Sequence, residues 1–357
     1  MKILYAPSGA ENNISGINSV SKNLITEICK LTDAEDLYEL GSPGLFELGL
    51  SKIPVICGDY DYHISYALSF YSIDIIHILN LPPVGIPASL KQIMTINDIR
   101  PLVNSEWDTK QYYDILNTNL RYAAVKSDRI VTCSQYTKKT IIDAFNVDEN
   151  KIQVIPWAVP DDVLKIRDIS TGDSPVDSPY ILSVISNAWA PSKNLRGLIR
   201  SYFTFRERHK EKIRLVLLGK IKEVNDLDSM LSENPSYAQD IIIPGFVSDS
   251  ELGRYYKHAL CFVCLSFFEG FGLPLLEAMS FELPCISSNV TSLPDVGGDS
   301  VCYCDPYDEE SIQEAFDKTV YSDEYRKDLR KKALQRSSSF SYRTTAQEYM
   351  DLYKSLT

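Results

Sequence analysis

One segment, Ser266–Leu283, constrains this chain more than any other; it has the sequence SFFEGFGLPLLEAMSFEL. Glu269 precedes a Gly-Phe-Gly sequence, and Glu277 follows eight residues later within a helical pattern. This order predicts a strand, a tight loop and a helix, and the glycines allow the backbone to approach a ligand closely. Because the first turn of a helix carries free N–H groups and the positive end of the helix dipole, we expect an anionic ligand there, a phosphate, with the two carboxylates placed to receive hydroxyl groups.

Length and charge limit the class of protein. A chain of 357 residues is too long for one compact core, so two domains are expected. The net charge of -12 argues against a general nucleic-acid binder. It also argues against docking on an anionic membrane, although a local basic patch leaves peripheral contact open. The sequence has no apolar run of about 18 residues, so no transmembrane helix is expected, and the start MKILYAPSGA predicts a buried strand and no signal peptide.

The eight cysteines favour a reducing compartment. Most stand in apolar runs, as small core side chains do. Cys261 and Cys264 have CxxC spacing, but in the expected strand they would face opposite ways. The sequence has no second CxxC pair and no histidine cluster, so we expect no metal site. The prediction is a cytoplasmic protein without a resident cofactor.

Strand and helix patterns alternate along the chain and predict two doubly wound parallel sheets. The expected strands of the first half are the apolar runs at 2–6, 53–57, 73–79, 92–96, 129–133 and 152–155. Those of the second half are at 180–185, 213–218, 241–243, 259–265, 285–287 and 301–304. Between them lies a stretch rich in Pro, Asp and Ser, which is typical of a linker. We therefore predict an α/β domain at 1–160, a linker at 161–179 and a second α/β domain at 180–340.

Polar residues at predicted strand ends are candidates for the site, because ligands of open α/β sheets bind there. Lys193 follows the strand 180–185 at a helix start, where it either reaches a phosphate or is an ordinary solvated lysine. Asn97 and Asp98 follow the strand 92–96 and either face the ligand or cap a turn.

Other candidates carry less weight. Asp59 and Asp61 have the D-x-D spacing of a metal-nucleotide site, but this spacing arises readily by chance in an Asp-rich chain. His77 stands in an apolar strand and is predicted to be a hydrogen-bonded core residue. The motifs Gly-x-Ser-x-Gly, HExxH and the Walker lysine loop are all missing from the sequence, so nothing points to those classes of enzyme.

The segment SFFEGFGLPLLEAMSFELPCISSNVTSLPDVGG closely resembles the Glu-x7-Glu segment of the retaining glycosyltransferases of family 4. Four other stretches resemble motifs of the same family, so the likeness covers most of the chain: TINDIRPL, TCSQYTKKTIIDAFNVDENKIQVIPWAV, SNAWAPSKNLRGLIRSY and IIIPGFVSDSELGRYYKHALCFVCLS. The resemblance implies the GT-B fold, with two Rossmann-like domains facing each other across a cleft. It also implies that a C-terminal helix at 341–357 crosses back onto the N-terminal, acceptor-binding domain.

The resemblance implies a role for each matching residue. Glu269 would bind hydroxyl groups of the donor sugar, Lys193 would neutralise the diphosphate, and Glu277 would bind the ribose. Asn97 occupies the position of the catalytic histidine in the family's cleft, and Ser192 occupies the position of an arginine in the family's donor site. The remaining donor contacts would fall on Gly270, Phe271, Gly272, Leu273, Phe246 and Val247, and contacts to phosphate and acceptor on Ser15 and Gly16.

Three departures from the family pattern bear on activity. Asn97 keeps hydrogen-bonding capacity but loses the imidazole. Ser192 removes one charge partner of the diphosphate, and Arg196, one turn along, is a candidate substitute. The usual glycine before Pro284 is shifted into Phe281–Leu283, which would only reshape a loop.

The function implied is retaining transfer of a hexose from a nucleotide-diphosphate sugar, of the UDP-glucose or GDP-mannose type, to a glycan or other hydroxyl acceptor. No metal ion would be needed, and the departing phosphate would accept the acceptor's proton on the same face of the sugar. Two alternatives remain. One is a nucleotide-sugar epimerase or sugar phosphorylase on the same fold, and the other is a non-catalytic nucleotide-sugar binder.

Overall fold

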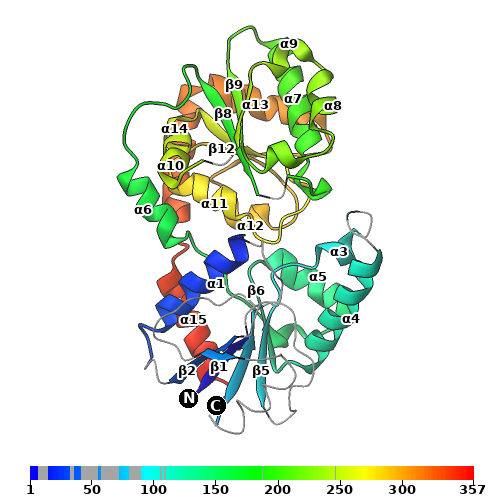
Figure 1. The fold of residues 1–357 in the computed structure, drawn as a ribbon, viewed down its shortest axis with the longest axis vertical. Coiled ribbons are helices and arrows are strands. Elements are labelled where there is room, and N and C mark those ends of the chain that lie inside the picture. The colour runs from blue at the N-terminus through cyan, green and yellow to red at the C-terminus, as the bar shows by residue number, and fades with distance from the viewer. Residues whose placement is uncertain are drawn as a thin grey trace. The chain divides into compact units, whose positions relative to one another are not determined.

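The computed structural model describes residues 1–6, 15–32, 36–41, 55–57, 72–79, 90–104, 107, 110–186, 188–245 and 247–357. The predicted candidates Asp59, Asp61 and Phe246 lie outside these residues. The chain forms two compact units, one of Met1–Pro160 together with Phe340–Thr357, and one of Asp161–Ser339. Each is an α/β unit whose paired strands all run parallel (Figure 1).

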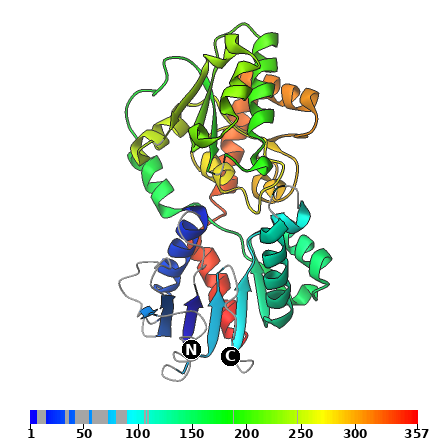
Figure 2. The same ribbon diagram turned by 45° about the vertical axis from the view of Figure 1, so that its right-hand side comes forward.

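The first unit is built on a seven-stranded sheet in the order β3-β2-β1-β4-β5-β6-β7. Its strands are β1 (Ile3–Ala6), β2 (Leu37–Gly41), β3 (Val55–Cys57), β4 (Ile75–Ile78), β5 (Lys91–Thr95), β6 (Arg129–Thr132) and β7 (Ile152–Val154). Its helices include α1 (Ser15–Ile28), α3 (Arg100–Val103), α4 (Lys110–Lys126), α5 (Gln135–Phe145), the 3-10 turn η3 (Glu149–Lys151) and α15 (Tyr342–Lys354). Helix α1 packs against α15. Helices α4 and α5 share a core with Met94 and Ile130 on the other face of the sheet (Figure 2).

A buried polar network joins α15 to this sheet. The His77 Nδ1 atom lies 2.7 Å from the Tyr353 hydroxyl, and Nε2 lies 2.8 Å from the Thr95 hydroxyl. The Tyr5 hydroxyl donates to that of Tyr353 at 3.3 Å, and the Tyr349 ring centroid lies 5.3 Å from that of His77. Burial lowers the pKa of His77 to about 3, so the imidazole is neutral. His77 is therefore the hydrogen-bonded core residue that the sequence predicts.

The second unit is built on a six-stranded sheet in the order β10-β9-β8-β11-β12-β13. Its strands are β8 (Tyr180–Ile185), β9 (Arg214–Gly219), β10 (Ile241–Gly245), β11 (Cys261–Cys264), β12 (Cys285–Ser288) and β13 (Cys302–Cys304). Its helices and 3-10 turns include α6 (Asp161–Ile169), η4 (Pro191–Lys193), α7 (Leu195–Arg208), η5 (Ile221–Glu223), α8 (Leu227–Ser232), α9 (Pro235–Ala238), α10 (Asp249–His258), α11 (Leu273–Ser280), α12 (Leu293–Gly297), α13 (Glu309–Tyr321) and α14 (Asp323–Ser337).

Both faces of the second sheet are covered. Helices α7 and α13 share one core cluster with the strands, which includes Phe205 and Phe316 with ring centroids 5.4 Å apart. On the other face α10 lays Tyr256 near Phe262 of β11, at 6.3 Å between ring centroids. Within the described residues every helix is too short or too polar to span a bilayer.

Most described strands coincide with the predicted apolar runs, and the differences concern short elements. Strand β2 has the sequence LYELG, which is too short to show a clear alternation. The segment predicted to be a linker contains α6, and the polar stretch 220–239 contains η5, α8 and α9. Helix α1 begins at Ser15, so Ser15 and Gly16 lie in its first turn.

Candidate functional site

The adjacent strands β8 and β11 bring Lys193 and Glu269 together, because the carboxyl ends of parallel strands meet at one edge of the sheet. The Lys193 ammonium group donates to both carboxylate oxygens of Glu269, at 2.8 and 2.7 Å. The two side chains are 17% and 12% exposed, so the pair is sheltered but still meets solvent. Together they line a small pocket with Ser183, Val184, Ile185, Ser186, Leu198, Cys264, Leu265, Ser266 and Pro274.

Each member of this pair keeps capacity for a ligand. An ammonium group has three donors, and Glu269 takes two of those of Lys193. The carboxylate also accepts from the Ser266 hydroxyl at 2.8 Å. One N–H of Lys193 therefore remains for a phosphate oxygen, and a lone pair of Glu269 remains for a sugar hydroxyl.

Hydroxyl groups that follow β12 hold the loop that carries Glu269. The Glu269 amide donates to the Thr291 hydroxyl at 3.2 Å. The buried Ser292 hydroxyl contacts two carbonyl groups, those of Glu269 at 2.8 Å and Phe271 at 3.0 Å. Neither hydroxyl residue is predicted from the sequence, because a loop sequence does not indicate which backbone groups its hydroxyl groups will contact.

Gly272 connects this loop to helix α11 and tolerates no side chain. Its φ of +103° lies in the region that favours glycine. A Cβ atom built there would lie 2.7 Å from Cδ2 of Leu293. The amides of Leu275 and Leu276 donate to the Gly272 carbonyl, at 3.0 and 3.2 Å. The Leu273 amide has no acceptor among the described residues, so it is the first-turn donor available to an anion.

Ser192 and Asn194, the two neighbours of Lys193, join the turn η4 to the residues that follow β11. The Ser192 carbonyl accepts from the Phe267 amide at 2.8 Å, and the Asn194 side-chain amide donates to the Leu265 carbonyl at 3.0 Å. The Ser192 side chain is only 1% exposed, and its hydroxyl has no partner in the described part of the chain. Ser192 thus supports the site through its backbone, and its contact with a donor stays a prediction.

Glu277 lies on α11, half-buried, and accepts a hydrogen bond from the Tyr256 hydroxyl at 3.0 Å. Burial raises the pKa of this carboxyl group to about 7; the Tyr256 hydrogen bond opposes the shift, and the charge of Asp162 adds to it. Glu277 therefore exchanges its proton near neutral pH.

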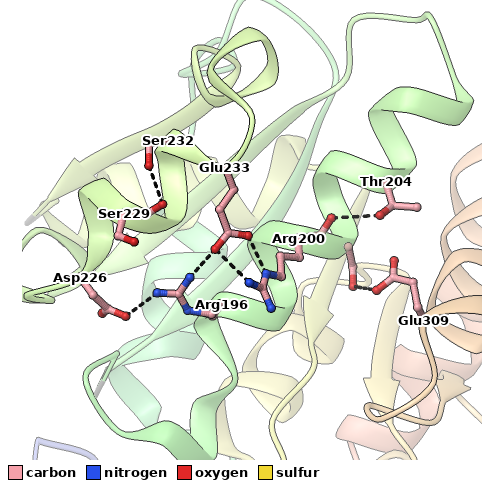
Figure 3. A network of polar contacts seen from close by, with 9 residues as sticks. Arg196, Arg200, Thr204, Asp226, Ser229, Ser232, Glu233 and Glu309 are labelled. Carbon is pink, nitrogen blue, oxygen red and sulfur yellow. Dashed lines mark hydrogen bonds and ion pairs between the residues drawn. The ribbon is translucent and has the colours of Figure 1, made fainter.

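Arg196, the candidate substitute for the missing family arginine, contacts surface carboxylates in the structure. Its guanidinium group donates to Asp226 at 2.8 Å and pairs with Glu233 (Figure 3). Glu233 also accepts from Arg200 at 2.6 and 3.1 Å. These surface carboxylates bind the guanidinium group, so the described contacts give no support to Arg196 as a partner of the diphosphate.

Asn97 lies in the first unit, and its side chain is 6% exposed. It lines a small pocket with Val20, Ser21, Leu24, Leu79, Thr95, Trp157, Tyr342, Thr345 and Tyr349. Its neighbour Asp98 accepts from the Arg100 amide at 3.1 Å, which is the turn-capping alternative raised above. Val247 is in the loop after β10. No described contact tests the roles predicted for Asn97, Val247, Ser15 or Gly16.

Relatives of known family share this sequence pattern. Residues 167–336 match the family described as Glycosyl transferases group 1, and residues 48–163 match Glycosyltransferase Family 4. The chain is 28% identical over 291 residues to O-antigen chain mannosyltransferase B of Escherichia coli, and this aligned region covers 78% of this chain and 74% of the relative. It is 27% identical over 282 residues to the serotype-specific mannosyltransferase WbdA of Escherichia coli, which covers 76% of this chain but only 34% of that relative.

Solved structures share the fold at low sequence identity. A glycosyltransferase from Rickettsia africae ESF-5 superposes with a TM-score of 0.73 at 16% identity, over 99% of this chain and 98% of that one. HepE of Anabaena, in complex with UDP, superposes with a TM-score of 0.75 at 16% identity, over 99% of this chain and all of that one. The Glu-x7-Glu segment, the two α/β units and these matches together identify the chain as a glycosyltransferase of the family 4 type with the GT-B fold.

Proposed function

We propose that the protein is a retaining mannosyltransferase that moves mannose from GDP-mannose to a hydroxyl group of a glycan, without a metal ion. The related mannosyltransferases of Escherichia coli support the choice of sugar and the glycan acceptor. The observation that carries the donor site is the contact of Lys193 with both carboxylate oxygens of Glu269 at the ends of β8 and β11. The sugar and the diphosphate of a nucleotide sugar are neighbours, and so are these two groups.

The order of the strands supports one orientation of the donor. Val247 follows β10 at one end of the sheet, and we assign the base to its backbone and that of Phe246. Glu277, which contacts Tyr256 of α10, takes the ribose. Lys193 and the amides from Gly270 to Leu273 take the diphosphate, and Glu269 takes hydroxyl groups of the sugar.

The proposed chemistry breaks the bond between the sugar C1 atom and a phosphate oxygen. Negative charge then develops on the leaving diphosphate, where Lys193 and the positive end of α11 stabilise it without a metal ion. The acceptor oxygen bonds to C1 on the same face of the sugar, and its proton passes to the departing phosphate oxygen. We assign the reacting sugar of the acceptor to the first unit, where Asn97, Ser15 and Gly16 are the predicted contacts.

A donor panel tests the proposal: GDP-mannose, UDP-glucose, UDP-galactose and UDP-N-acetylglucosamine, each scored by thermal shift and by transfer to a mannoside. At a hundred times its Kd a donor adds about 2.7 kcal/mol to the free energy of unfolding, so GDP-mannose should raise Tm by several degrees. NMR of the product should show the anomeric configuration of the donor, and EDTA should leave the rate unchanged. If none of the four nucleotide sugars shifts Tm, the donor site is refuted. An inverted product refutes the retaining mechanism alone, and binding without transfer favours the non-catalytic alternative.

The location is also part of this proposal. None of the seven cysteines whose side chains the structure describes forms a disulfide bond, and five of them are buried. Cysteines without a disulfide bond suit a reducing compartment, and we therefore place the reaction in the cytoplasm.

A further inference from the structure

Two stacked aromatic rings lie at the same sheet edge as the Lys193–Glu269 pair. Phe267, two residues before Glu269, and Tyr307, in the loop after β13, have ring centroids 4.7 Å apart and planes inclined by only 11°. Tyr307 is 69% exposed, the largest exposed fraction among the large hydrophobic side chains that the structure describes. We call these two residues the aromatic platform.

The platform is fixed in place before any ligand binds. The Tyr307 amide donates to the Asp305 carboxylate at 2.9 Å, and the Asp305 amide donates to the Ser311 hydroxyl at 3.0 Å. On the other side, the Phe267 amide donates to the Ser192 carbonyl, next to Lys193. These bonds hold the backbone of both residues, and the rings stack on each other, so the platform loses little conformational freedom when a ligand binds to it.

The strand order locates the platform relative to the donor, on the donor orientation proposed above. The base is assigned to the β10 end of the sheet, and the diphosphate and sugar to β8 and β11 in its middle. Phe267 of the platform follows β11 and Tyr307 follows β13, so the platform lies on the side of the proposed sugar position that is away from β10. Two residues of extended chain span at most about 7 Å, so Phe267 lies within one or two sugar lengths of Glu269.

We infer that the aromatic platform is a binding subsite for the glycan acceptor, holding a sugar residue distal to the one whose hydroxyl group reacts. A pyranose ring has one face of C–H groups, and an exposed aromatic ring is a complementary apolar surface for it. The platform is neutral in a chain of net charge -12, which suits an uncharged sugar better than an anionic partner. This inference rests on the proposed function, because it takes its ligand from the glycan acceptor proposed there.

The test compares acceptor lengths in the full-length protein. Linear α-linked manno-oligosaccharides of one to five residues serve as acceptors, with the wild-type protein and the variants Tyr307→Ala and Tyr307→Phe. For Tyr307→Ala we expect the KM for the pentasaccharide to rise by about fivefold or more, whereas the KM for the monosaccharide and for GDP-mannose stays unchanged. Tyr307→Phe retains the ring and should behave like the wild type.

Direct binding separates failure of this inference from failure of the proposed function. Isothermal titration with mannopentaose requires no donor and no turnover, so it is informative even if GDP-mannose is not the donor. Weaker binding to Tyr307→Ala than to wild type supports the platform. Three results would overturn it: no binding of the pentasaccharide to the wild type, equal loss for short and long acceptors, or a change of oligomeric state in Tyr307→Ala, which would mark a protein interface instead.

Discussion

Lys193 and Glu269 are each other's main partner, although each is expected to act on a different part of the donor. The pairing keeps two sheltered charges satisfied, which matters because an unpaired buried charge is costly. It also gives the two groups a shared geometry, so that a change at one alters the position of the other. We expect a donor to insert between existing contacts rather than to create the site.

Removing either member of the pair should therefore abolish most transfer. Lys193→Ala and Glu269→Gln should each lower kcat/KM by on the order of 10²- to 10³-fold, since each removes charge or hydrogen bonding aimed at the transition state. The double variant should be less impaired than the two losses multiplied together, because the residues act as a unit. Steady-state kinetics with GDP-mannose measures all three.

Arg196→Ala is the matched control for these variants. Arg196 lies in the first turn of α7, the helix that follows Lys193, but its contacts are surface carboxylates, and surface pairs contribute about 0 to 1 kcal/mol. Its kcat/KM should equal that of the wild type. Loss of activity in Arg196→Ala, or its retention in both Lys193→Ala and Glu269→Gln, would contradict the roles given to these residues.

Ionised Glu277 should lower the stability of the folded protein while it supports donor binding. Its pKa of about 7 in the folded protein exceeds the ordinary 4.5, so between these values the native state binds more protons than the unfolded chain. Stability therefore falls as pH rises through this window. Glu277→Gln should be more stable than the wild type by about 1 to 3 kcal/mol at pH 8 and nearly equal to it at pH 5, by urea unfolding.

The same variant should bind GDP-mannose more weakly at pH 8, because the amide replaces the ribose acceptor. A gain in stability with unchanged donor affinity would leave Glu277 as a buried acid without a role in the donor site. The Tyr256 hydroxyl can still donate to the Gln oxygen, so the change tests the charge and not the packing.

At the scale of elements, the site consists of two short segments, η4 and the loop that leads from Glu269 into α11, each tied to its neighbours by hydrogen bonds. Gly272 is the point where the second segment meets the Thr291–Ser292 loop and Leu293. The packing at this junction fixes the backbone that leads from Glu269 to the Leu273 amide. A change of backbone angle there would move both.

Gly272→Ala tests this junction, and Gly172→Ala is its control. Both glycines have φ of +103°, but a Cβ at Gly172 has only the Arg254 side chain within 4 Å, at 3.9 Å, whereas one at Gly272 meets Leu293 at 2.7 Å. Gly172→Ala should cost about 1 to 2 kcal/mol of backbone strain only. Gly272→Ala should lower the free energy of unfolding by about 1 to 3 kcal/mol more than Gly172→Ala does, as measured by chemical denaturation. It should also weaken donor binding. Equal costs and equal donor affinities would show that the junction is not tightly packed.

The sequence predicts the strands of these sheets well because long apolar runs have few alternatives. It predicts the Lys193–Glu269 neighbourhood because strand ends and the Glu-Gly-Phe-Gly motif coincide. It does not predict α6, α8 or α9, which are short and polar, so that tertiary packing decides their conformation. Nor does it predict that Thr291 and Ser292 hold the Glu269 loop, or that Tyr307 stacks on Phe267, since these contacts join residues about 22 to 40 positions apart.

At the scale of the whole molecule, the two units carry opposite responses to pH. His77 of the first unit has its pKa lowered from 6.5 to about 3, so the unfolded chain binds more protons between those values and stability falls as pH falls. Glu277 of the second unit has its pKa raised, so its contribution falls as pH rises. Each described unit thus contains a buried group, and His77 lowers stability at acid pH whereas Glu277 lowers it at alkaline pH.

Calorimetry of the wild type between pH 5 and 8 should show this as two transitions that move in opposite directions. Lowering the pH should lower the Tm of the unit formed by Met1–Pro160 and Phe340–Thr357, and it should raise the Tm of Asp161–Ser339. The Gln side chain of His77→Gln keeps hydrogen-bonding capacity but cannot become charged. In this variant the free energy of unfolding of the first transition should depend less on pH, by up to about 1.4 kcal/mol per pH unit. If His77→Gln keeps the full acid sensitivity of the wild type, another group is responsible.

The position of α15 sets the order in which the chain can fold during synthesis. Helix α15 supplies buried Ala346, Tyr349 and Tyr353 to a sheet whose first strand begins at Ile3. A ribosome therefore releases the whole of Asp161–Ser339 before the last element of the first unit emerges. The second unit in the sequence is the first that can be completed. The N-terminal sheet, with one face covered only in part by α1, must wait for α15 during some 190 residues of translation, a period in which we expect it to depend on chaperones.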